Sequence, residues 1–184
     1  MKIKQKIPWW TKIFLKIILA RLPFNYQFWQ NIGLFRHGKM DNTQYAIEVF
    51  LSHLKKSEIK ELKEKTIMEV GPGDSISSAI ISYSFGAKSI LLDVGRYAKS
   101  NTSTYLKLSN NLKKMGYSPP DIVASDNLEK ILIKSSASYL TAGYKDLKKI
   151  KSESIDLIYS QAVLEHISLD DFKNTFNEFF RILK

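Results

Sequence analysis

Residues 66–75 read TIMEVGPGDS, in which a short apolar run is followed by a turn that contains two glycines. The apolar run has the length of a buried strand, and residues 76–85 carry the apolar pattern of a helix that ends at Gly86. Glycines in such a turn let the backbone approach a ligand, and the N-terminus of the following helix offers unpaired N–H groups. The segment therefore predicts a strand, a ligand-binding turn and a helix.

The alternation of strand and helix continues to the end of the chain. We expect further strands at residues 89–93, 138–142 and 155–160, and further helices at residues 102–115, 127–134 and 169–184. The last helix is expected to face inward with Phe172, Phe176, Phe179, Phe180 and Leu183. Strands that alternate with helices pair in parallel through right-handed crossovers. The fold class is thus α/β, with a Rossmann-like parallel sheet and an N-terminal helical extension.

The first 23 residues are strongly basic. They carry six basic residues and no acidic one, around an apolar stretch that begins with Trp9 and Trp10. The stretch is too short and too charged to span a bilayer, and no signal-peptide cleavage site follows it. Two interpretations stay open: an interfacial helix on an anionic membrane surface, or a helix packed on the chain's own domain.

Residues 24–65 are expected to form a helical cap segment before the sheet, which occupies residues 66–184. Asp41 or Asn42 can cap a helix that runs from residue 43 to about residue 55, and His53 is expected on its surface. Aromatic and basic side chains interleave in the first part of the segment, but no nucleic-acid-binding signature accompanies them. We therefore expect no nucleic acid partner.

The composition limits the chemistry that the chain can carry. It has no cysteine, and its three histidines lie far apart without metal-ligand spacing, so no metal site is expected. The net charge is +10, of which residues 1–65 contribute +8, from thirteen Lys and Arg against five Asp and Glu. We expect a cytoplasmic protein, peripheral on the inner face of the membrane if residues 1–23 bind lipid.

An acidic residue after the next strand supports a ligand site. Asp93 ends the expected second strand, 20 residues after Gly73, where a carboxylate can accept both hydroxyls of a ribose. A dinucleotide site requires a further glycine where this chain has Ile76, and Asp74 would repel a pyrophosphate. Glu69 and Asp74 instead suit a ligand that bears a sulfonium and an ammonium group. The residues favour S-adenosylmethionine over a dinucleotide.

The sequence resembles the class I S-adenosylmethionine-dependent methyltransferases, and within them a bacterial subgroup like methyltransferase type 11. The stretches that carry the resemblance are residues 35–40, 68–75, 91–95, 154–166 and 180–184. The resemblance implies that Glu69, Gly71 and Gly73 line the methionine moiety of the cofactor. It also implies that Asp93 binds the ribose, that Val94 lies beside the adenine, and that Ser160 and Gln161 close the methionine side. An acid that contacts adenine after the third strand corresponds to Asp146 only with a shift.

The resemblance leaves the catalytic base and the acceptor open. His166 and His37 are weak candidates for a catalytic role, and the expected acceptor is a small molecule or a glycan. Members of the family continue beyond the motif at residues 180–184 with further strands, so we expect a chain truncated after its fourth strand, incomplete at the C-terminus. A partner chain that completes the sheet, and a non-catalytic cofactor-binding remnant, are the alternatives.

Overall fold

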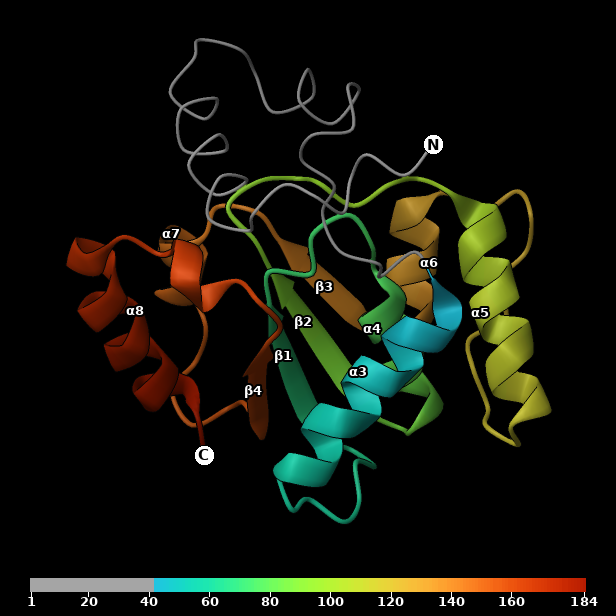
Figure 1. Cartoon of the computed structure of the whole chain (residues 1–184), viewed down its shortest axis with the longest axis horizontal. Coiled ribbons are helices and arrows are strands. Elements are labelled where there is room, and N and C mark those ends of the chain that lie inside the picture. The colour runs from blue at the N-terminus through green and yellow to red at the C-terminus, as the bar shows by residue number, and fades with distance from the viewer. Residues whose placement is uncertain (1–41) are drawn as a thin grey trace, which may run out of the picture. The chain divides into compact units, whose positions relative to one another are not determined.

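Four parallel strands form the central sheet of residues 42–184, the part of the chain that the computed structural model describes (Figure 1). The strands are β1 (Thr66–Val70), β2 (Lys88–Leu92), β3 (Ala137–Leu140) and β4 (Leu157–Ser160), in the order β3-β2-β1-β4. The order reverses between β1 and β4, and ligands of such sheets bind at the carboxyl ends of the strands beside that reversal. The expected α/β class and its parallel sheet are confirmed.

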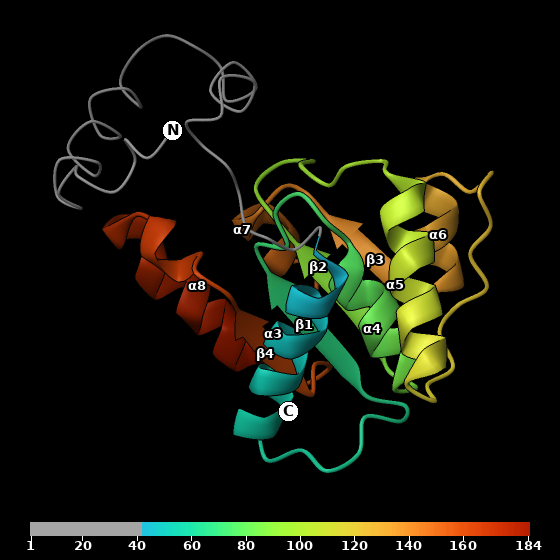
Figure 2. The same ribbon diagram turned by 45° about the vertical axis from the view of Figure 1, so that its right-hand side comes forward.

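The helices cover both faces of the sheet (Figures 1 and 2). The helices of residues 42–184, with one 3-10 turn in this part of the chain, are α3 (Thr43–Lys56), α4 (Ser77–Ser84), α5 (Thr102–Lys114), α6 (Leu128–Lys134), α7 (Tyr144–Leu147), η1 (Leu164–His166) and α8 (Leu169–Ile182). Apolar side chains of α3, α4, α5 and α6 form one core with one face of the sheet, and those of α7 and α8 form a second core with the other face. The candidate site lies at the carboxyl ends of the strands, where Val70, Leu92 and Leu147 of the second core line it.

Local caps explain where several helices begin and end. The side chain of Asn42 accepts hydrogen bonds from the backbone N–H groups of Gln44 and Tyr45, and that of Asn127 accepts one from Lys130. Gly86 follows α4 with a φ of +78°, a conformation that costs glycine little. The elements expected between residues 66 and 184 begin and end within two residues of the observed ones.

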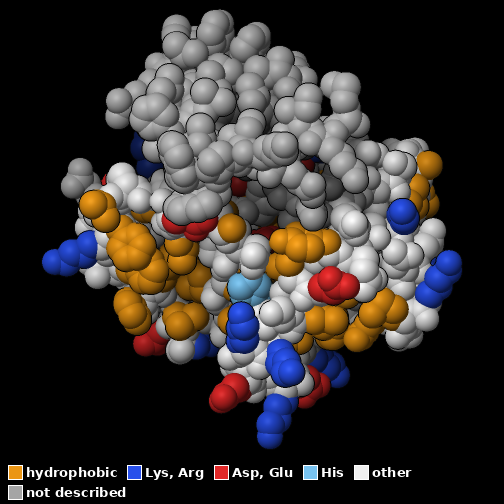
Figure 3. Space-filling model, viewed as in Figure 1, with side chains coloured by type: hydrophobic (Ala, Val, Ile, Leu, Met, Phe, Trp, Pro, Cys, Tyr) orange, Lys and Arg blue, Asp and Glu red, His pale blue; other side chains and the backbone are white. Residues whose placement is uncertain are grey.

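Fewer apolar side chains of α8 are buried than the sequence predicts. Phe179 is buried, but Phe180 is 76% exposed and Phe172 is 39% exposed. Phe180 lies at the edge of the apolar stripe, because it is one residue, or about 100° of helix, beyond Phe179. Figure 3 shows hydrophobic side chains gathered on the surface over α8.

Among the described strands, β3 and β4 form the edges of the sheet. Beside β4, Leu183 makes a parallel bridge with Ile155, in which Ile155 N–H donates to Ile182 O and Lys184 N–H donates to Ile155 O. Within residues 42–184 no helix is long and apolar enough to cross a membrane. The expected helix in residues 1–23, the cap segment before residue 42, and His37 lie outside the described residues.

Candidate cofactor site

A cavity of about 430 Å³ opens at the carboxyl ends of β1 and β2. Its walls come from the ends of β1 and β2, from α7, and from the segment that runs from β4 into α8. The lining residues include Gly71, Asp93, Val94, Gly143, Tyr144, Leu147, Val163, His166, Ile167 and Asp171. Four residues named from the sequence thus border this cavity, namely Gly71, Asp93, Val94 and His166.

The glycine turn, residues 71–75, has glycine at two positions for different reasons. Gly71 has a φ of +77°, and a Cβ added to it would lie 2.4 Å from Cγ2 of Val163. Gly73 has a φ of +66°, and a Cβ added there would meet no described atom within 4 Å. Gly71 therefore permits a close approach of the next wall, whereas Gly73 leaves open space in front of the turn.

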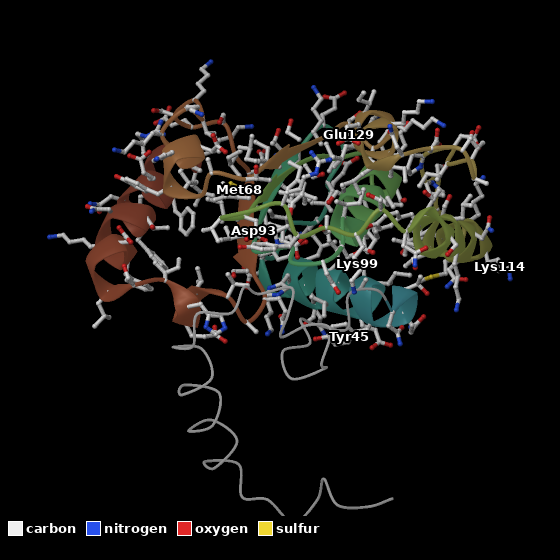
Figure 4. All side chains as sticks on the ribbon, turned by 90° about the horizontal axis from the view of Figure 1, so that it is seen from above. Tyr45, Met68, Asp93, Lys99, Lys114 and Glu129 are labelled. Carbon is white, nitrogen blue, oxygen red and sulfur yellow. The ribbon has the colours of Figure 1, made fainter. Side chains whose placement is uncertain are left out.

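Asp93 is held at the end of β2 by bonds on both sides. Its backbone N–H donates to Leu140 O, and its backbone carbonyl accepts from the N–H of Gly143, each at 2.9 Å. Its carboxylate accepts from the N–H of Val94 at 2.8 Å and from that of Gly73 at 3.3 Å. The Asp93 carboxylate is therefore fixed beside the glycine turn. Asp93 is labelled in Figure 4, which views the molecule from above.

Glu69 does not line the cavity. It is 2% exposed, and its carboxylate accepts a hydrogen bond from the hydroxyl of Ser78 at the start of α4. The pKa of Glu69 is raised to about 7, chiefly by burial. The Ser78 hydrogen bond opposes this rise, and the nearby charge of Asp93 adds to it. Glu69 is thus a buried acid whose protonation responds to any charge placed near the turn.

Asp74 binds Lys99, which lies in the loop that follows β2. Its buried carboxylate lies 2.7 Å from Nζ of Lys99, and its backbone carbonyl accepts from the N–H of Lys99. The Tyr105 hydroxyl donates to Lys99 O and accepts from the N–H of Ile76. Asp74 was expected to face a ligand cation, and the structure shows a lysine of its own chain beside it.

The two residues expected to close the methionine side do not line the cavity. The hydroxyl of Ser160 donates to Val70 O at 3.0 Å, so it ties β4 to the end of β1. The side chain of Gln161 lies 3.0 Å from Nε2 of His53 in α3. His53, expected on the helix surface, is half-buried and stacks on Tyr159 of β4, with ring centroids 4.8 Å apart.

Several residues of the site carry no signal in the sequence. Val163, Gly143 and Tyr144 reach the cavity only because the segments after β4 and β3 fold back over the sheet ends.

Asp146 does not reach the cavity. Its carboxylate accepts a hydrogen bond from the N–H of Ala142 and pairs with Lys149, and the Lys149 hydrogen bond lowers the pKa of Asp146. Within residues 42–184 no three acids or histidines are arranged to hold a metal ion.

A methyltransferase domain family matches residues 68–184, which is more than half of the chain. The chain belongs to this family. The expected cofactor, S-adenosylmethionine, is the cofactor that the family uses. No curated protein matches the sequence.

Solved structures of methyltransferases are similar to the chain at low identity. Phosphoethanolamine N-methyltransferase 2 of Haemonchus contortus, in complex with phosphomonomethylethanolamine and S-adenosylhomocysteine, is 16% identical, with a TM-score of 0.46 over 74% of this chain and 26% of that one. WbdD, a bifunctional kinase-methyltransferase, is 13% identical, with a TM-score of 0.44 over 92% of this chain and 34% of that one. The chain thus spans about a quarter to a third of the length of these proteins.

Proposed function

We propose that the chain binds S-adenosylmethionine in the cavity at the ends of β1 and β2 and directs its methyl group to a small-molecule or glycan-type acceptor. The observation that carries the proposal is the joint placement of the glycine turn and the Asp93 carboxylate, which the N–H of Gly73 contacts directly. A volume of about 430 Å³ lies in the range of small-molecule sites.

The residues present fit this cofactor. Asp93 would accept the ribose hydroxyls, and Val94, Gly143 and Tyr144 would provide the wall for the adenine. Glu69, two residues before Gly71, would supply negative charge near the turn once it loses its proton. The cofactor, when bound, supplies a methyl group that is already activated on a sulfonium.

Methyl transfer of this kind is an in-line displacement, so positioning of the acceptor provides much of the acceleration. A general base is needed only where the acceptor must lose a proton. Of the two candidates, His166 borders the cavity at the end of η1. We propose that His166 is the base for an acceptor that must lose a proton. His166→Gln should then lower kcat for a hydroxyl acceptor, while the affinity of the protein for S-adenosylhomocysteine changes less.

The charge of the described cavity wall supports a small or sugar-like acceptor over a nucleic acid. Asp93 and Asp171 line the cavity, and the described lining contains no lysine or arginine. Polyanionic acceptors are bound through clustered basic side chains, which neutralise their phosphates. The test is methyl transfer from labelled cofactor to matched panels of sugars, small amines and alcohols, and RNA or DNA. Transfer to nucleic acid alone would contradict the proposed acceptor class.

A cofactor-binding remnant without activity is the alternative. It predicts saturable binding of S-adenosylhomocysteine together with no transfer to any panel.

A partner chain that completes the sheet would pair with the edge of β4. Light scattering gives the mass of the purified protein and of any complex that it pulls down from a cell extract, and so separates a lone chain from an assembled one.

We further propose that residues 1–23 attach the protein to the inner, anionic face of the cytoplasmic membrane. The support is the sequence itself, with six basic residues, no acid and two tryptophans around an apolar stretch. Co-sedimentation with vesicles should rise with anionic lipid and fall with salt. Equal recovery on neutral and anionic vesicles would contradict the electrostatic part.

A further inference from the structure

We propose that His53 is a positioning residue of the cofactor site, which acts through Gln161 on the wall that closes over the glycine turn. The inference rests on the proposed function and deepens it. It connects the last turn of α3, which the cap segment contributes, to the segment that leaves β4.

The first link is the contact of His53 with Gln161. Nε2 of His53 lies 3.0 Å from Oε1 of Gln161, so the tautomer with a proton on Nε2 donates a hydrogen bond to the amide oxygen. The two residues are 108 positions apart in sequence, and the bond therefore joins two elements that only the fold brings together. Gln161 is exposed, and in the described structure this is the contact that holds its side chain.

The second link runs from Gln161 to the cavity wall. Ala162, the next residue, has a φ of +55°, a left-handed conformation that is strained for a residue with a Cβ. Val163 follows, and its side chain fills the space in front of Gly71. A strained residue keeps its conformation only where the surrounding structure fixes it. The hydrogen bond to His53 fixes Gln161, which precedes Ala162, and packing on Gly71 fixes Val163, which follows it.

The third link runs through the ring of His53. It stacks on Tyr159 at an interplanar angle of 28°, and Tyr159 is paired with Glu69 across the sheet. Both the hydroxyl of Tyr159 and the carboxylate of Glu69 interact with Ser78 at the start of α4. Burial, together with the charge of Glu69, raises the pKa of Tyr159 well above its ordinary value. His53 thus packs on the same side chain, Tyr159, that neighbours the buried acid Glu69.

Four variants test the inference: His53→Ala, His53→Gln, Gln161→Ala and the double variant His53→Ala with Gln161→Ala. His53→Ala and Gln161→Ala should each raise the Kd for S-adenosylhomocysteine about five- to tenfold. The double variant should bind no more weakly than either single one, because both remove the same link. His53→Gln keeps a donor at this position and should restore part of the affinity. Lys55→Ala, on an exposed position of the same helix, is the matched control and should bind as the wild type does.

Hydrogen exchange of the ligand-free protein gives a readout that does not depend on the cofactor. Peptides that cover residues 160–167 should exchange faster in His53→Ala than in the wild type or in Lys55→Ala, while peptides of β2 should not change. If the wild type binds and folded His53→Ala binds equally well, or if the two single effects multiply in the double variant, the inference is wrong. If the wild type does not bind S-adenosylhomocysteine, the proposed function fails, and the exchange of residues 160–167 alone decides whether His53 holds the wall.

Discussion

Gly71 and Val163 meet across the mouth of the site, and a Cβ on Gly71 would lie within 2.8 Å of three atoms of the Val163 side chain. The two residues come from the ends of β1 and β4, the strands between which the order of the sheet reverses. The wall of the cavity therefore depends on the absence of a side chain at Gly71.

We expect Gly71→Ala to lower the free energy of unfolding by more than about 2 kcal/mol, because the left-handed backbone and the collision with Val163 act together. Gly73→Ala has the same backbone conformation without the collision and should cost only about 1–2 kcal/mol. Denaturant unfolding of both variants measures the difference. Val163→Ala in the Gly71→Ala background should recover part of the loss, and no recovery would show that the collision does not determine it.

The raised pKa of Glu69 makes a prediction about stability and pH. Between pH 4.5 and about 7 the unfolded chain loses this proton while the folded protein keeps it, so this group lowers stability as pH rises through that window. The full effect is about 3 kcal/mol, since one pKa unit corresponds to about 1.4 kcal/mol. Glu69→Gln removes the titration, and the stability of the wild type relative to this variant should therefore fall across the window. A constant difference would contradict a raised pKa.

The raised pKa of Glu69 also predicts that the protein releases protons when it binds a cationic ligand. A ligand that places a positive charge near the turn favours the carboxylate of Glu69, so binding at pH 6 to 6.5 should release a fraction of one proton. Calorimetry in buffers of different ionisation enthalpy measures this number. Glu69→Gln should bind with the release abolished, and an equal release in this variant would assign the proton to another group.

The pair of Asp74 and Lys99 is expected to hold the loop after β2 against the glycine turn. The side chain of Asp74 is 4% exposed and that of Lys99 is 51% exposed, so Lys99→Met leaves a carboxylate buried without its cation. We expect a loss of about 1–3 kcal/mol in unfolding free energy. Asp74→Asn added to Lys99→Met should regain stability. Lys107→Met, at an exposed position of α5, is the control and should be neutral.

The positions of strands and helices were predictable because each element carries its own pattern. β1 is a run of apolar residues bounded by a glycine turn, and α5 and α8 carry apolar side chains at helical spacing. Such local signals define the elements and their order, and the order of alternating elements implies the parallel sheet. Phe180 shows the limit of the pattern, because a residue at the edge of an apolar stripe is buried or exposed according to what packs beside it.

The candidate site was predictable where its residues follow a strand directly or fall within a stretch that carries the family resemblance. Gly71, Asp93 and Val94 border the cavity for the first reason, and His166 borders it for the second. The contacts of Lys99, Val163 and His53 were not predictable, since each residue lies on a loop or helix whose path depends on tertiary packing. His53 in particular has the pattern of a surface residue on α3, and only the position of β4 gives it partners.

Titration calorimetry with S-adenosylhomocysteine, on the wild type and on Asp93→Ala, tests whether this cavity holds the cofactor. We expect saturable binding at one site per chain by the wild type. We expect binding at least tenfold weaker in Asp93→Ala, because hydrogen bonds to a charged acceptor contribute about 1.5–3 kcal/mol. Circular dichroism must show that both proteins are folded. A folded wild type that binds nothing, or an Asp93→Ala variant with an unchanged Kd, would contradict the assignment of this cavity to the cofactor.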